Sequence, residues 1–249
     1  MISLITANEE KRKNGFTLLE LLIVISIIAI LSIALVFLLN PAETLKKARD
    51  AQRISDLKTI KTALGVMLTA SSTPSLDSFT AQATAVCLTA TTAAGATTLS
   101  TAPKIRYSAN TAPTLTSATP GADAASTATA FISAASGSTA GKVDATGWIP
   151  VNLKALTGGT PISAFPIDPV NTVSSTATVT DLVYRYACQN GTTASVGSGK
   201  PAYIFEIDAV LESNAYTQDD NKMSKDGGDN DSYYESGNSL NLLPAAGAF

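Results

Sequence analysis

The longest apolar run in the chain lies near its N-terminus. Residues 21–39 hold no charged side chain, and Ser26 and Ser32 are their only polar positions. As a helix this run would span roughly 28 Å, which is close to the thickness of the hydrocarbon core of a bilayer. The pattern therefore predicts a membrane-spanning helix, with the carboxylate of Glu20 just inside its start.

A second, amphipathic pattern follows the apolar run. Asn40-Pro41 predicts a break, because proline lacks a backbone donor and disfavours helical geometry in the residue before it. Apolar side chains then recur at steps of three and four through residues 41–70, which predicts a helix with one face to bury. We interpret the charged side chains of this segment as its solvent-facing side. The apolar stripe consists of Leu45, Ala48, Ile54, Leu57, Ile60, Leu64 and Met67 or Leu68.

The pattern changes again after residue 70. Residues 71–147 are rich in Ser, Thr and Ala, and they hold few large apolar groups to offset the entropy cost of ordering, so a variable and largely irregular region is expected. Alternation with a period of two appears in residues 202–211, and residues 181–188 are rich in Val and Tyr. Both segments read as strands, and the glycine-containing link between them predicts an antiparallel hairpin.

Packing the apolar face of this hairpin onto the amphipathic helix predicts an α+β fold. In this fold a long N-terminal helix, half apolar and half amphipathic, packs against a small antiparallel sheet. Residues 148–153 are a further strand candidate, because Pro150 suits an edge strand or the start of a strand.

Charge and composition narrow the range of functions. Residues 40–70 hold six basic and three acidic side chains, whereas residues 71–249 hold eight basic and fourteen acidic ones. This acidic balance argues against a general nucleic-acid surface, because phosphate binding needs clustered Lys and Arg. The chain also contains no histidine, which removes the commonest general base, and we expect a protein that is not an enzyme.

A short basic leader precedes the apolar run. Lys11-Arg12-Lys13 is followed by Gly15 and then by Phe-Thr-Leu-Leu-Glu at residues 16–20. Together with the apolar run, this sequence resembles the class III signal of type IV pilins and type II secretion pseudopilins. The resemblance is specific over residues 11–39 and only architectural beyond about residue 69.

The resemblance implies how this stretch is processed. A membrane-bound prepilin peptidase would remove residues 1–15 and methylate the new amine of Phe16, so that cleavage follows Gly15. Glu20 would then pair with the Phe16 amine of an adjacent subunit during assembly. The pairing makes physical sense, because an unpaired carboxylate is costly in an apolar environment. An ordinary signal anchor, in which Glu20 is incidental, is the alternative.

The resemblance also implies a function and a domain organisation. We expect a structural subunit of a type IV pilus-like filament, whose partners are other pilin subunits, the peptidase and the inner membrane. A type II secretion pseudopilin and, from another class, a membrane-anchored binding or adhesion module are the alternatives. The expected segments are a cleaved leader (1–15), a transmembrane and filament-core helix (16–40), an amphipathic helix (41–70), a variable region (71–147), and the sheet with an acidic C-terminal loop (148–249).

The flanking charges give an opposing indication of topology. Three Lys or Arg residues precede the apolar run, and six follow it within about 20 residues, so the positive-inside rule alone would leave the globular part in the cytoplasm. We nevertheless expect a single pass through the inner membrane and an extracytoplasmic globular part, because the peptidase of this family works at the cytoplasmic face. Assembly would then carry the globular part to the cell surface.

Two further sets of side chains are candidates for special chemistry. Cys87 and Cys188 would form a disulfide in an extracytoplasmic protein, with two buried free thiols as the alternative. Asp226, Asp229 and Asp231 lie in an acidic, glycine-containing loop. Some pseudopilins that this chain resembles bind calcium near the C-terminus, so these carboxylates are candidate Ca²⁺ ligands. A solvated acidic loop is the alternative.

Overall fold

The computed structural model describes residues 15–77, 87, 90–93, 96–99, 105–108, 132–133, 140–172, 181–190 and 203–243. The chain divides into two compact units, Met1–Thr44 and Leu45–Phe249. We call the second unit the head.

The first unit is built on helix α1, Leu18–Leu39. The described large apolar side chains of this helix are exposed. Within the described residues, α1 is the one helix long and apolar enough to cross a membrane, over Leu18–Val36. The predicted apolar helix is therefore present.

The predicted break at Asn40-Pro41 is confirmed. Asn40 takes a left-handed conformation with φ 38°, and helix α2, Pro41–Ala70, begins at the next residue. The Asn40 carbonyl accepts hydrogen bonds from the amides of Glu43 (3.1 Å) and Thr44 (3.2 Å). The Glu43 amide is one of those that the first turn of a helix otherwise leaves without a partner.

The head is organised around α2. One side of this helix contributes Leu57, Ile60, Leu64 and Met67 to the main core, as predicted. At its N-terminal end the prediction is wrong, because Leu45 is 61% exposed. The buried stripe continues instead through charged residues, as described below.

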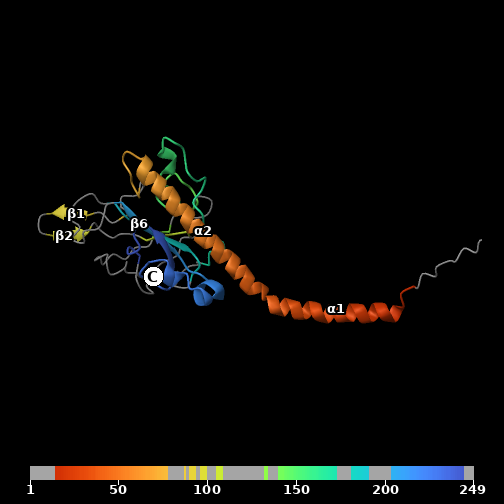
Figure 1. Ribbon diagram of the computed structural model, residues 1–249. Coiled ribbons are helices and arrows are strands. Elements are labelled where there is room, and N and C mark those ends of the chain that lie inside the picture. The colour runs from red at the N-terminus through yellow and green to blue at the C-terminus, as the bar shows by residue number, and fades with distance from the viewer. Residues whose placement is uncertain are drawn as a thin grey trace, which may run out of the picture. The chain divides into compact units, whose positions relative to one another are not determined.

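A five-stranded sheet packs against this face of α2. Its order is β4-β3-β5-β6-β7, in which β3 and β4 are parallel and all other neighbours are antiparallel. In Figure 1, α2 runs across the sheet that contains β6. The strands are β3 (Arg106–Tyr107), β4 (Ile132–Ser133), β5 (Tyr184–Gln189), β6 (Ile204–Ala209) and β7 (Tyr234–Gly237).

The β5–β6 pair is the predicted hairpin. Its register places Tyr186 opposite Ile207, and both side chains face the core beneath α2. The alternation read from residues 202–211 is confirmed, because Phe205, Ile207 and Ala209 all belong to this core. The fold is thus α+β, as predicted.

Two features of the head differ from prediction. Residues 148–153 are not a strand: they make one isolated bridge, Asp144 with Asn152, and lead into the short helix η2, Leu153–Ala155. The indole of Trp148 is buried and donates to the Pro166 carbonyl (2.9 Å), and the amides of Trp148 and Leu153 donate to the carbonyls of Ala140 and Val143 (both 2.8 Å). Side-chain packing and these loop hydrogen bonds, rather than a regular strand ladder, order the segment. Strand β7 was not predicted.

The other described elements are not part of the five-stranded sheet or of helix α2. Strands β1 (Ala90–Ala93) and β2 (Ala96–Leu99) form a separate antiparallel hairpin within the Ser/Thr-rich region. The short helices η3 (Ala215–Asp219) and η4 (Met223–Lys225) occupy the loop between β6 and β7.

Candidate processing and assembly site

The start of α1 holds the side chains that the leader motif predicted. Thr17 is the N-cap of α1, and Glu20 is the third residue of the helix. The Glu20 Oε2 atom accepts hydrogen bonds from the Thr17 amide (2.9 Å) and the Thr17 hydroxyl (2.8 Å), while the Glu20 amide donates to Thr17 Oγ1 (3.2 Å). This reciprocal capping box holds the carboxylate at the positive end of the helix dipole.

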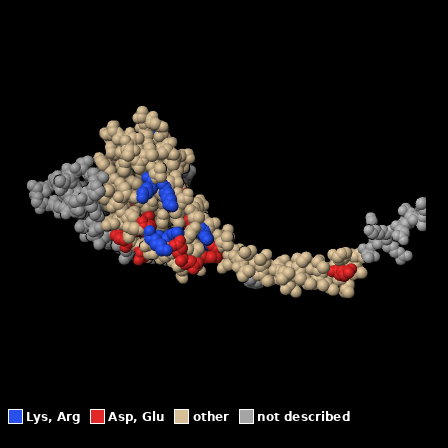
Figure 2. All heavy atoms as spheres, in the orientation of Figure 1, with Lys and Arg blue, Asp and Glu red and all other residues tan. Residues whose placement is uncertain are grey.

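The surroundings of Glu20 are apolar. Between residues 15 and 39 it is the only charged side chain, and the surface of α1 shows acidic atoms only near its start (Figure 2). Phe16, four residues before it, is 77% exposed. Cleavage after Gly15 would therefore create a backbone α-amine at a residue that is open to contact with a neighbouring molecule.

The two serines of α1 do not add polar contact points to this surface. Ser26 Oγ donates to the Ile23 carbonyl (2.7 Å), and Ser32 Oγ donates to the Ile28 carbonyl (2.7 Å). Because both hydroxyls are satisfied by the backbone of their own helix, they can lie in an apolar environment at little cost. Glu20 remains the one charged group that needs a partner there.

The arrangement around Glu20 is suited to ion pairing. A carboxylate on a lipid- or protein-facing helix is stable only when it is neutralised, hydrogen-bonded or paired with a cation. The Thr17 cap supplies hydrogen bonds but no charge. An amine at Phe16 of a second copy would supply the charge.

The candidate cysteines are paired in the structure. Cys87 and Cys188 form a disulfide with a Cα–Cα distance of 4.6 Å, and both residues are buried. The bond ties the segment around residue 87 to the end of β5 and closes a loop with a sequence separation of 101.

The three candidate calcium ligands are not gathered into one ligand set. Within the described part of the chain, no group of three His, Cys, Asp or Glu side chains is placed to hold a metal ion. Asp226 instead accepts from the amides of Gly228 (2.9 Å) and Glu235 (2.7 Å), whereas Asp229 and Asp231 are exposed. Calcium binding by this loop stays a prediction.

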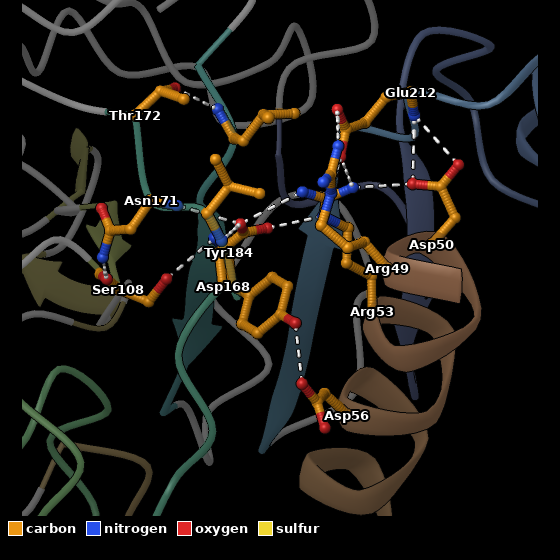
Figure 3. Close-up of polar contacts among 12 residues, drawn as sticks. Arg49, Asp50, Arg53, Asp56, Ser108, Asp168, Asn171, Thr172, Tyr184 and Glu212 are labelled. Carbon is orange, nitrogen blue, oxygen red and sulfur yellow. Dashed lines mark hydrogen bonds and ion pairs between the residues drawn. The ribbon is translucent and has the colours of Figure 1, made fainter. Parts of the chain in front are cut away.

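A buried ion-pair network on α2 was not predicted. Arg53 Nε donates to Asp168 Oδ2 (2.7 Å), and Arg53 Nη1 donates to Asp50 Oδ1 (2.7 Å) and to Glu212 Oε1 (2.8 Å) (Figure 3). The side chains of Asp50, Arg53 and Asp168 are fully buried. Arg49 adds a second cation on Glu212, with Nε 2.8 Å from Oε1.

The same carboxylates also fasten two loops to the helix. Asp50 Oδ2 accepts from the Ser213 amide (2.7 Å), and Asp168 Oδ1 accepts from the Val170 amide (2.9 Å). Although burial disfavours the charged form of Arg53, its hydrogen bonds and charge interactions with Asp168 and its other partners raise its pKa. The interpretation of all α2 charges as solvent-facing is therefore wrong for Asp50 and Arg53.

A sequence signal for this network did exist. Asp50 and Arg53 precede Leu57 and Ile60 at steps of three and four, so they lie on the same stripe as the apolar core residues. Their partners, Asp168 and Glu212, are more than a hundred residues away, and no local pattern marks them.

Comparison with known proteins agrees with the geometry at the start of α1. Residues 11–36 match the model of the prokaryotic N-terminal methylation motif, a match that includes the basic leader, Gly15, Phe16, Glu20 and most of the apolar helix. No curated protein and no solved structure was found to match the chain. The chain is therefore a prepilin-like protein: it carries the N-terminal methylation motif of pilins and pseudopilins, proteins that are not enzymes.

Proposed function

We propose that the protein is a structural subunit of a type IV pilus-like filament. The observation that carries the proposal is Glu20: a single carboxylate, hydrogen-bonded to the N-cap residue Thr17, at the start of a helix whose described large apolar side chains are exposed. Such a surface is stable in a bilayer or in the core of an assembly, but not in water.

The proposed assembly proceeds in two steps. Prepilin peptidase cuts after Gly15 and methylates the Phe16 amine while α1 is held in the inner membrane. Subunits then join through α1, and neighbouring apolar side chains replace lipid. Because lipid and apolar side chains solvate α1 about equally well, the hydrophobic effect gives little driving force for association, which rests on side-chain packing and polar contacts. The pairing of Glu20 with the amine of the next subunit is the contact that specifies the register.

The proposed topology places the head outside the cytoplasm. The Cys87–Cys188 bond supports this location, because disulfides form and persist mainly in oxidising compartments. The basic residues that follow α1 need not indicate a cytoplasmic head. Two of the six, Arg49 and Arg53, have a structural role in the head, where they pair with Glu212.

Substitution of Glu20 tests the proposal. We expect Glu20→Ala to leave the protein processed and membrane-inserted but to abolish or strongly reduce filaments in electron micrographs of whole cells. Because this variant also loses the capping box, Thr17→Val is the matched control: it removes the hydroxyl of the cap, worth about 1 kcal/mol, and keeps the carboxylate. We expect Thr17→Val to assemble.

Normal filaments from Glu20→Ala would overturn the role given to Glu20. Equal loss of filaments in Thr17→Val would assign the effect to helix capping instead. Mass spectrometry of both variants must show the same mature N-terminus, so that a processing defect is not read as an assembly defect. A secretion defect without surface filaments in the corresponding deletion strain would favour the pseudopilin alternative.

A further inference from the structure

The face of the sheet turned away from α2 carries a buried pair of acids. Glu206 on β6 is 0% exposed, and Glu235 on β7 is 3% exposed. In the β6–β7 register Glu235 lies opposite Asp208, and Gly237 lies opposite Glu206, so all four positions share one face of the sheet. The two glutamates are thus diagonal neighbours on adjacent strands.

One oxygen of each glutamate fastens a backbone segment. Glu206 Oε2 accepts from the amides of Leu242 (2.6 Å) and Leu243 (2.9 Å). Glu235 Oε2 accepts from the Asn230 amide (3.3 Å). The pair therefore fastens both the segment after β7 and the loop before it to the sheet.

The other oxygen of each glutamate has no donor. Oε1 of Glu206 and Oε1 of Glu235 are both buried without a protein hydrogen-bond donor. Gly228 lets the Glu235 carboxylate sit this deep, because a Cβ at position 228 would collide with it. The two glutamate side chains interact with each other. Two buried carboxylate oxygens without donors would each carry a large desolvation cost, and a proton shared between them would remove that cost.

The nearby cation is already committed. Arg185 on β5 donates through Nε to Asp208 Oδ1 (2.7 Å), and its guanidinium lies 3.7 Å from the centre of the Tyr233 ring. Arg185 is the cation that the described residues place beside the pair, and its salt bridge is with Asp208 rather than with Glu206 or Glu235. Several charged or titratable groups of the described residues share this face with the pair: Asp208 on β6, Arg185 on β5, Tyr107 on β3 opposite Arg185, and Asp226 and Tyr233 from the segment before β7. A cluster of apolar side chains lies on the same face: Ile105, Ala187, Ile204, Leu242 and Leu243.

We propose that Glu206 and Glu235 share one proton, and that this proton closes a pH-sensitive latch formed by residues 226–232 and 238–243 on the outer face of the sheet. Loss of the proton to solvent leaves two carboxylates side by side in a dry site. Their repulsion and their demand for water then release the two segments and expose the outer face.

The sign of the pH dependence follows from the burial of the pair. Burial raises the pKa of Glu206 and of Glu235 above the ordinary value of a glutamate, and the interaction between the two acts in the same direction for Glu235. Acids with a raised folded-state pKa stabilise the closed state below that pKa and stop doing so as the pH rises through it. The latch is therefore closed in acid and opens towards alkaline pH.

Hydrogen exchange of the full chain in detergent micelles tests the latch. We expect the protection factors of the Leu242 and Leu243 amides, corrected for intrinsic exchange, to fall at least about tenfold between pH 6 and pH 9, which corresponds to one unit of pKa shift. Glu235→Gln keeps a hydrogen-bond donor at every pH, so its protection should change less than about twofold over this range. Asp219→Asn, which replaces an exposed acid in the loop between β6 and β7 outside the latch, is the matched control and should follow the wild type.

Several outcomes would overturn the proposal. Constant protection in the wild-type protein would do so without any variant, which keeps the test valid if Glu235→Gln fails to fold. A Glu235→Gln protein that loses protection in parallel with the wild type would also contradict it. Loss of protection at pH 6 on addition of EDTA would show that a metal cation, rather than a proton, bridges the pair.

Discussion

At the scale of single residues, the chain contrasts two ways of keeping charge away from water. Glu20 is capped by Thr17 at the start of an apolar helix, and it lacks a cation within its own unit of the described structure. Arg53 is buried in the head and has three carboxylate partners. The charge of Glu20 is not neutralised within its unit, so it could pair with a cation from another molecule. The charge of Arg53 is neutralised within the head, where the ion pairs contribute to stability.

Removal of the buried cation should destabilise the head strongly. Arg53→Met leaves Asp50 and Asp168 buried without their ion-pair partner, a change that typically costs about 3–5 kcal/mol. Chemical unfolding of the full chain in detergent, followed by tryptophan fluorescence of the buried Trp148, measures the loss. Lys58→Met, an exposed position on the same helix, is the control and should change stability by less than about 0.5 kcal/mol. Equal effects from the two variants would contradict a structural role for the network.

At the scale of elements, the periodicity of apolar residues in the sequence predicted the helices and the strand that have one apolar face. The apolar run of α1, the stripe of α2 and the alternation of β6 each follow one period over many residues, and each is present in the structure. Strand β7 was missed because it is four residues long and carries polar side chains, Glu235 and Ser236, at buried positions. In the sequence, such buried polar residues resemble surface residues.

The same limit applies to the candidate sites. Gly15, Phe16 and Glu20 could be proposed as site residues because the leader motif that contains them is local and continuous in sequence. The network of Arg53 joins residues that are 115 and 159 positions apart, so only the fold brings them together. For residues 148–153, Pro150 indicated a strand, but the burial of Trp148 decides the local structure.

Removal of the Cys87–Cys188 disulfide should lower the free energy of unfolding of the head. Cys87→Ser with Cys188→Ser removes a bond that closes a loop of about a hundred residues, and the chain-entropy model gives a loss of about 4–5 kcal/mol. Thermal unfolding of the full chain with and without dithiothreitol measures this loss. The reductant should lower the wild-type melting temperature to that of the double variant and leave the variant unchanged. A wild type that is insensitive to reductant would indicate that the bond adds little to stability.

At the scale of the whole molecule, the two units meet different demands. The first unit exposes apolar surface along α1 and offers one charge, whereas the head buries its own core and its own ion pairs. Assembly is therefore assigned to the first unit, and the head is built to be stable by itself. The central claim is that processing creates the cation that Glu20 lacks.

Mass spectrometry of the mature protein, purified from the membrane of the native host, tests that claim most directly. The account predicts an N-terminal peptide that begins at Phe16 and carries one added methyl group on its α-amine, with residues 1–15 absent. An N-terminal peptide that retains Met1 would contradict it, because no amine would then exist at Phe16 to pair with Glu20.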